Sequence, residues 1–180
     1  FKNLIISTGA TFDEEIKKTA DVLNENEMKF SFLHCVTIYP TPLDDVNLSR
    51  IDFLRQFSPE AGFSDHTLVA RDGIKASVAA IAHGADYIER HFTILDVDKS
   101  KDGPVSITPA HLKELSKYSK MDPIELKAQI KDIVPEYDIM IGVPTRDLSD
   151  AELLNRDYYR GRFATIFGGE YVYNWEDKLI

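Results

Sequence analysis

The chain has 180 residues, 43% of them hydrophobic and 28% charged, a composition typical of one globular domain. Its net charge of −9 argues against nucleic acid as the main partner, because phosphate binding needs a basic surface. No stretch approaches the ~20 apolar residues of a membrane span, so we expect no membrane partner. The single cysteine rules out an internal disulfide and favours a reducing, cytoplasmic compartment.

Short apolar runs alternate with helical patterns through residue 120. Thr11 and Thr108 are the expected N-caps of two of the helices, and Pro40 and Pro42 enforce a loop after the second strand. In chain order, we expect a strand over 4–7, a helix over 13–24, a strand over 29–35, a helix over 48–57, a strand over 61–64, a helix over 73–83, a strand over 85–89 and a helix over 109–120.

This order makes four β/α units, each with its chemically rich residues directly after the strand. Sites in α/β barrels and open α/β sheets lie at the carboxyl ends of the strands. An open four-stranded sheet would leave apolar edges unprotected, so we favour half of a TIM (β/α)8 barrel. Because the chain begins with Phe1 and not Met, we expect a piece of a longer protein, with the other half-barrel missing or supplied by another chain.

The pattern changes after residue 120. We expect helices over residues 123–133 and 150–160, with charges, aromatics and turn residues elsewhere in this part. We therefore divide the chain into a half-barrel domain, residues 1–120, and a helical or irregular extension, residues 121–180.

Two histidines follow neighbouring predicted strands. His66 ends the segment Ala61 to His66, and His91 ends the segment Ala85 to His91. Parallel strands joined by a helix end at the same edge of the sheet, so both imidazoles should point into one opening at that edge, which we call the mouth. Two imidazoles that converge there could bind a divalent metal. The alternative is two hydrogen-bonded histidines at strand ends.

The segments that follow the strands resemble the sialic acid synthase family. The resemblance covers roughly residues 1–120 and rests on several motifs in the family's order. These are Ser7-Thr8-Gly9, Leu33-His34-Cys35, Tyr39-Pro40-Thr41-Pro42, Asp45-Val46-Asn47-Leu48, Gly62 to Thr67, Ile88 to Thr93 and Gly103-Pro104.

The resemblance implies the last four units of a (β/α)8 barrel in an enzyme that is expected to be a homodimer. It implies that phosphoenolpyruvate (PEP) condenses with an N-acylated hexosamine related to N-acetylmannosamine. The product would be a nine-carbon 2-keto sugar acid, and phosphate would be released. It also implies a divalent metal, Mn²⁺ in preference to Mg²⁺ or Co²⁺, with His66 and His91 as its ligands.

By the same resemblance, Glu89 and Tyr39 are catalytic candidates. Glu89 would line the site and either transfer protons or orient the groups that contact the metal, and the alternative is a strand-end carboxylate paired with a neighbour such as Arg90. Tyr39 would contact the acceptor sugar, and the alternative is an aromatic ring packed on proline. Further substrate-binding candidates are Ser7, Thr8 and Ser64, whose hydroxyls could hold PEP or serve only as helix caps. Thr37 is a fourth candidate, at a position where the family often carries Asn or Ser.

Four other residues are expected to be structural. We expect His34 and Cys35 to pack in the core, His83 to end a helix and His111 to be exposed.

The chain departs from the family's pattern at the acceptor. Val105 follows Gly103-Pro104 where the family often has an aspartate that binds the sugar, and Asp98, Lys101 or Asp102 could replace it. The tail does not resemble the family's small antifreeze-like domain. That domain usually supplies an arginine to the acceptor, and either Arg160 or Arg162 could take its place. The alternative functions are another metal-dependent barrel aldolase, for example one that uses pyruvate, or a non-catalytic sugar-binding remnant.

Overall fold

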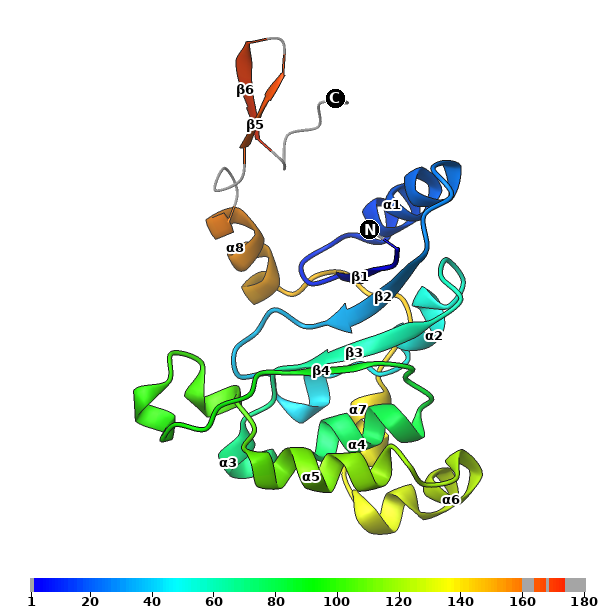
Figure 1. The fold of residues 1–180 in the computed structure, drawn as a ribbon, viewed down its shortest axis with the longest axis vertical. Coiled ribbons are helices and arrows are strands. Elements are labelled where there is room, and N and C mark those ends of the chain that lie inside the picture. Colours follow the sequence, from blue (N-terminus) through cyan, green and yellow to red (C-terminus); the bar gives the residue numbers. More distant parts are fainter. Residues whose placement is uncertain (1, 160–163, 168, 174–180) are drawn as a thin grey trace.

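A computed structural model describes residues 2–159, 164–167 and 169–173. Four parallel strands form one sheet in chain order, as Figure 1 shows: β1 (Leu4–Ser7), β2 (Phe30–Cys35), β3 (Ala61–Asp65) and β4 (Ile88–Arg90). All four lie within two or three residues of their predicted positions. The α/β class and the parallel half-barrel sheet are therefore confirmed, whereas the described residues do not form a closed barrel.

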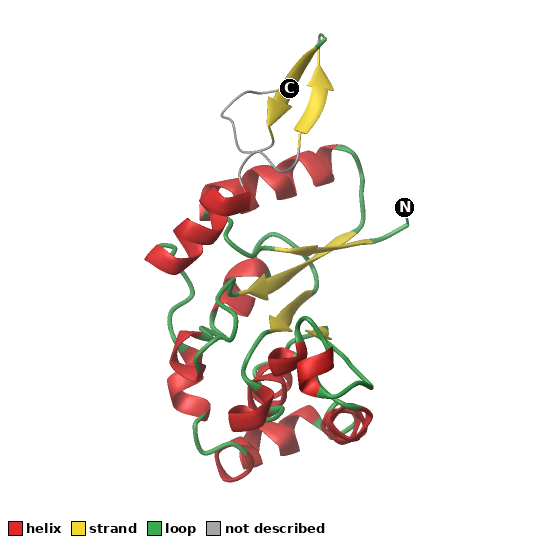
Figure 2. Ribbon diagram, turned by 90° about the vertical axis from the view of Figure 1, so that its left-hand side faces the viewer, coloured by secondary structure: helices red, strands yellow, loops and turns green. Residues whose placement is uncertain are grey.

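Helices follow each strand. They are α1 (Asp13–Glu25), α2 (Arg50–Leu54), α3 (Val69–Asp72), α4 (Lys75–Ala82), α5 (Pro109–Tyr118), α6 (Pro123–Ile133), α7 (Tyr137–Ile141) and α8 (Asp150–Tyr159). Short 3₁₀ turns occur at η1 (Leu43–Asp45), η2 (Val97–Lys99) and η3 (Gly103–Val105). A hairpin of β5 (Ala164–Phe167) and β6 (Glu170–Tyr173) lies at one end of the molecule in Figures 1 and 2.

Two local predictions are corrected. The N-cap of α1 is Phe12 and not Thr11, because the Glu15 carboxylate accepts the Phe12 N–H at 2.8 Å while the Thr11 hydroxyl donates to the Gly9 carbonyl. The helix expected over residues 48–57 is α-helical only over Arg50–Leu54, with turns on either side. Thr108 does occupy the N-cap position of α5.

The strands divide their side chains between two faces. One face packs Phe30, Phe32 and Phe63 against buried residues of the helices, including Ile16 of α1 and Ala79 of α4. The small side chains of α4 let this helix lie close to β3. The alternate residues face the other way, and they carry the polar groups of the candidate site.

The core continues past residue 120. Leu126 and Ile130 of α6 and Met140 of α7 are buried in the same cluster as the sheet residues. The predicted boundary at residue 120 stays a prediction, but these helices pack on the half-barrel. Within the described ranges, no helix has the length and apolar character needed to cross a membrane.

Candidate functional site

A ladder of paired side chains between β3 and β4 leads to the candidate site. Ser64 is in register with Glu89, and its hydroxyl donates to the Glu89 carboxylate at 2.6 Å. Two residues further along each strand, on the same face, come His66 and His91. Their ring centroids are 5.2 Å apart. The predicted convergence of the two imidazoles is therefore observed, and their role as metal ligands stays a prediction.

His66 is enclosed. Only 4% of the residue is exposed, and its Nε2 lies 2.9 Å from the Tyr39 hydroxyl, while its Nδ1 lies 3.8 Å from Cys35 Sγ. Burial, with a smaller effect of nearby His91, lowers the pKa of His66 to about 4. The ring is thus neutral at pH 7, which is the form that binds metals.

His91 is more open than His66. Its Nδ1 lies 3.6 Å from the Asp102 carboxylate, which the loop between η2 and η3 brings back to the end of β4. The sequence named Asp102 as one of three replacements for the family's aspartate, and the structure singles it out by this contact. Spacing could not do so, because the loop's path depends on pairing of Phe92 with Ile107.

The Glu89 carboxylate is not paired with Arg90 but with the Ser64 hydroxyl of the neighbouring strand. Arg90 instead forms an ion pair with Asp65 on the opposite face of the strands. Among the residues that the structure describes, Ser64 is the hydrogen-bond partner of Glu89, which is exposed toward the mouth. Its carboxylate is therefore open to a substrate.

The hydroxyl candidates divide into two groups. Ser7 is exposed on the same face as Ser64, and the buried Cys35 is the register partner of Ser64 on the neighbouring strand β2. Burial raises the pKa of Cys35 to about 11, so this thiol is neutral. Thr8 lies on the other face, where its hydroxyl donates to the Leu33 carbonyl at 2.9 Å, and the structure does not bring it to the mouth.

Thr37 lies beside the loop that carries Tyr39. Its buried Oγ1 has no hydrogen-bond partner within the described residues. A buried hydroxyl usually finds a partner, so this group is available to a bound ligand or water.

The histidines outside the mouth are structural. His34 is 2% exposed and pairs with the Val46 carbonyl at 2.7 Å, and burial lowers its pKa to about 3, which confirms the core prediction. His83 follows α4 and contacts Asp52 and Tyr137. The prediction that His111 is exposed is wrong: the residue is half-buried, because its Nδ1 accepts the N–H of Thr108, the N-cap residue of α5.

The sequence profile of the NeuB family matches residues 1–131. The chain belongs to the NeuB family. It is 41% identical over 121 residues to N,N'-diacetyllegionaminic acid synthase of Campylobacter jejuni, covering 63% of this chain and 34% of that one. It is 35% identical over 166 residues to pseudaminic acid synthase of the same species, covering 91% and 43%.

A solved NeuB-like structure shares the fold. The spore coat polysaccharide biosynthesis protein SpsE of Bacillus subtilis superposes with a TM-score of 0.68 at 28% identity, over 87% of this chain and 44% of that one. The chain thus spans less than half the length of these relatives.

The donor set of this NeuB-family chain fits a weakly held divalent cation. No cluster of three or more His, Cys, Asp and Glu side chains with metal-site geometry occurs among the residues that the structure describes. Two imidazole rings are nevertheless close together at an open mouth. Water and substrate oxygens would have to complete the coordination shell. The Tyr39 hydroxyl and a cation would compete for the same nitrogen of His66, Nε2.

A segment whose contacts the sequence did not indicate lies over the ends of β1 and β2, and its second half belongs to the helix predicted over residues 150–160. Arg146 forms two bonds with Glu152, at 2.6 and 2.7 Å, and Glu152 is only 1% exposed. From α8, Asn155 donates to the Thr37 carbonyl and Arg156 to the Ala10 carbonyl. We call residues 144–156 the strap. Arg160 and Arg162, which follow it, lie outside the described residues.

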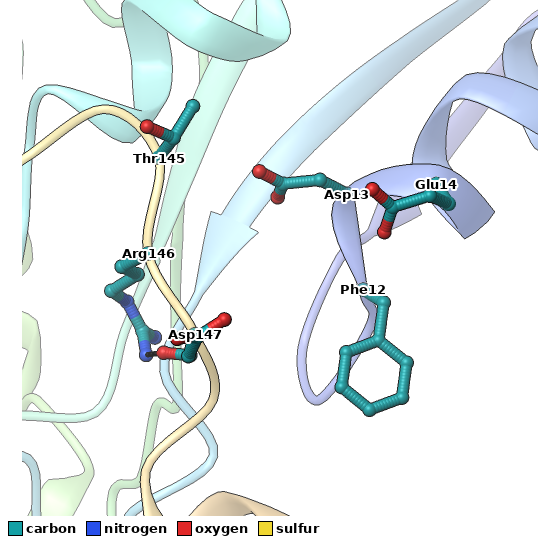
Figure 3. Close-up of a pocket in the computed structure, with 6 residues that line it drawn as sticks. All are labelled: Phe12, Asp13, Glu14, Thr145, Arg146 and Asp147. Carbon is teal, nitrogen blue, oxygen red and sulfur yellow. Dashed lines mark hydrogen bonds between the residues drawn. The ribbon is translucent and has the colours of Figure 1, made fainter.

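The strap also forms one wall of a cavity of about 290 Å³, shown in Figure 3. Its lining combines the start of α1 with Thr145, Arg146 and Asp147. The Arg146 side chain is committed to Glu152, so the remaining charges at this cavity are carboxylates. None of the predicted site residues lines it, and we separate it from the histidine mouth.

Proposed function

We propose that this chain carries part of the active site of a PEP-dependent synthase that makes a nine-carbon 2-keto sugar acid. The observation that carries the proposal is the convergence of the His66 and His91 rings beside the Tyr39 hydroxyl. Membership in the NeuB family and relatives named legionaminic and pseudaminic acid synthases support it.

In this proposal, His66 and His91 hold a divalent cation, Mn²⁺ in preference to Mg²⁺ or Co²⁺. A cation bound there supplies Lewis-acid polarisation of the acceptor aldehyde. The low pKa of His66 keeps its ring ready for this role at neutral pH, without a proton to displace.

The chain's own groups serve the substrates. The C3 carbon of PEP forms the new bond to the aldehyde carbon, and one water is consumed as phosphate leaves. Glu89, open at the mouth and oriented by Ser64, moves protons during these steps. Ser7, Thr37 and Ser64 offer hydroxyls to PEP, and Tyr39 contacts the acceptor.

Asp102 is the proposed acceptor carboxylate. It stands at the edge of the mouth beside His91, about half-exposed, and can accept hydrogen bonds from sugar hydroxyls or an acylamino N–H. The acceptor class is thus an open-chain N-acylated hexosamine.

The remaining partners belong to the same proposal. A second set of four β/α units would close the barrel against the edges of β1 and β4 and supply basic groups for PEP. We place the complete enzyme in the cytoplasm as a homodimer.

The test uses the complete polypeptide with PEP, Mn²⁺ and a panel of N-acylated hexosamines, and it measures phosphate release. His66→Ala and His91→Ala should each lower turnover at least about 100-fold, while His111→Ala should retain it. Carbon–carbon bond formation with pyruvate in place of PEP would favour an aldolase. If no acylated hexosamine releases phosphate and Mn²⁺ with PEP leaves thermal stability unchanged, the synthase proposal is wrong and the chain is a non-catalytic remnant.

A further inference from the structure

The opposite face of the two site strands holds a buried ion pair. Asp65 and Arg90 are register partners at the ends of β3 and β4, and their side chains form an ion pair. The Asp65 side chain is 0% exposed and the Arg90 side chain 3%. Each of these residues directly precedes one of the two histidines of the mouth.

Both charged groups also hold the residue that follows His66. The Asp65 carboxylate accepts the Thr67 N–H at 2.9 Å and the Thr67 hydroxyl at 2.8 Å. Arg90 donates to the same hydroxyl at 3.0 Å. The backbone of His66 is therefore fixed from both of its neighbours, and its carbonyl accepts the Thr41 N–H at 2.9 Å.

The pair is tied to the helical layer as well. Ser77 of α4 donates to the Asp65 carboxylate at 2.5 Å, and Arg90 donates to the Gly73 carbonyl at 3.3 Å. The ends of β3 and β4 are thus joined both to each other and to α4. These contacts are directional, whereas an apolar pair of the same volume would fill the space without fixing an angle.

We propose that Asp65 and Arg90 are positioning residues that set the spacing and orientation of the His66 and His91 rings. Successive residue pairs of β3 and β4 support this role: Ser64 with Glu89, then Asp65 with Arg90, then the two imidazoles. The metal-related part of this inference rests on the proposed function. The positioning itself is a property of the metal-free protein and can be tested without any metal.

The experiment compares Arg90→Lys and the neutral double variant Asp65→Asn/Arg90→Gln with the parent in the complete polypeptide. Arg90→Lys keeps the charge but loses the planar fork, and the double variant leaves no uncompensated charge. Leu126→Ala, buried in α6 away from the mouth, is the matched control for lost stability. The readouts are imidazole NMR signals without metal and the Mn²⁺ affinity from the EPR signal of free Mn²⁺.

We expect Arg90→Lys and the double variant to shift or broaden the NMR signals of His66 and His91 and to leave the signals of His111 unchanged. The dissociation constant for Mn²⁺ should rise about 10- to 100-fold, as it does when groups that orient metal ligands are removed. The Leu126→Ala protein should keep the parent signals and affinity while it melts earlier.

Two results have different meanings. If the parent shows no Mn²⁺ binding with or without PEP, the metal part of the proposed function fails, and the NMR comparison still decides the positioning. If Arg90→Lys, folded, has parent-like signals for both histidines, the positioning inference is overturned. Should that variant not fold, the same result with the double variant overturns it.

Discussion

The Tyr39 hydroxyl lies 2.9 Å from Nε2 of His66, and the two rings are tilted by 32° at a centroid distance of 4.1 Å. This contact places an acceptor-side residue directly on a candidate metal ligand. The hydroxyl and a cation would use the same nitrogen, so binding of one displaces the other.

The first prediction follows from that competition. Tyr39→Phe should bind Mn²⁺ as tightly as the parent or a few-fold more tightly, because no hydroxyl has to leave His66, while the KM for the acceptor should rise. Mn²⁺ titration by EPR and steady-state kinetics of the complete polypeptide measure the two effects. A Tyr39→Phe protein that loses Mn²⁺ binding would contradict the competition.

Glu89 should be needed for turnover and not for folding. Glu89→Gln keeps the shape and an acceptor for Ser64 but removes the base, so kcat should fall by about 10²- to 10⁴-fold with little change in melting temperature. Glu60→Gln, at the other end of β3, is the control and should retain kcat. Equal kcat for both variants would assign Glu89 a structural role.

Asp102 should govern the acceptor. We expect Asp102→Asn to raise the KM of the acceptor about 10-fold or more and to change the KM of PEP little, because a neutral amide binds sugar hydroxyls less strongly than a carboxylate. Asp98→Asn, in the exposed η2 turn, should behave as the parent. The opposite ranking of the two variants would move the acceptor contact to Asp98.

Mild acid should destabilise the fold through the buried histidines. Burial lowers the pKa of His66 to about 4 from an ordinary 6.5, so between these values the unfolded chain binds a proton that the folded chain does not. Stability is therefore complete above pH 6.5 and falls as the pH drops, by about 2 kcal/mol between pH 7 and pH 5 for this residue.

Urea unfolding at the two pH values tests this effect. His66→Gln should lose about 2 kcal/mol less than the parent between pH 7 and pH 5. His111→Gln should show the same loss as the parent, because this variant leaves the buried His66 in place. A parent-like loss in His66→Gln would show that His66 is not the group responsible.

The strap should depend on its buried ion pair. Glu152→Ala leaves Arg146 without its partner in a buried setting and should lower the free energy of unfolding by about 3–5 kcal/mol. Asp96→Ala removes the exposed partner of Lys99 and should cost less than about 1 kcal/mol. Chemical denaturation of the three proteins makes the comparison, and equal losses would contradict it.

The sequence alone located the strands, and with them both histidines. Strand ends can be located from the sequence because a buried parallel strand is a short apolar run. Functional side chains in such folds follow directly after these runs. The prediction of Thr11 as N-cap was wrong because the Glu15 carboxylate accepts the N–H of Phe12. Glu14 lies three residues after Thr11 and Glu15 three residues after Phe12, so the capping-box spacing fits either residue. The short helices α3 and α7 lack the length that makes a periodicity visible.

Local pattern therefore determined which residues are candidates for the chemistry: His66, His91, Glu89 and the hydroxyls after the strands. Only the tertiary structure decided which of them meet. It turned Thr8 to the helical face, brought Asp102 to His91 and paired Arg90 with Asp65 and not with its neighbour Glu89. The reason is physical: alternation and apolar runs are short-range properties of the chain, whereas cross-strand register and the return path of a loop are set by packing between residues far apart in sequence.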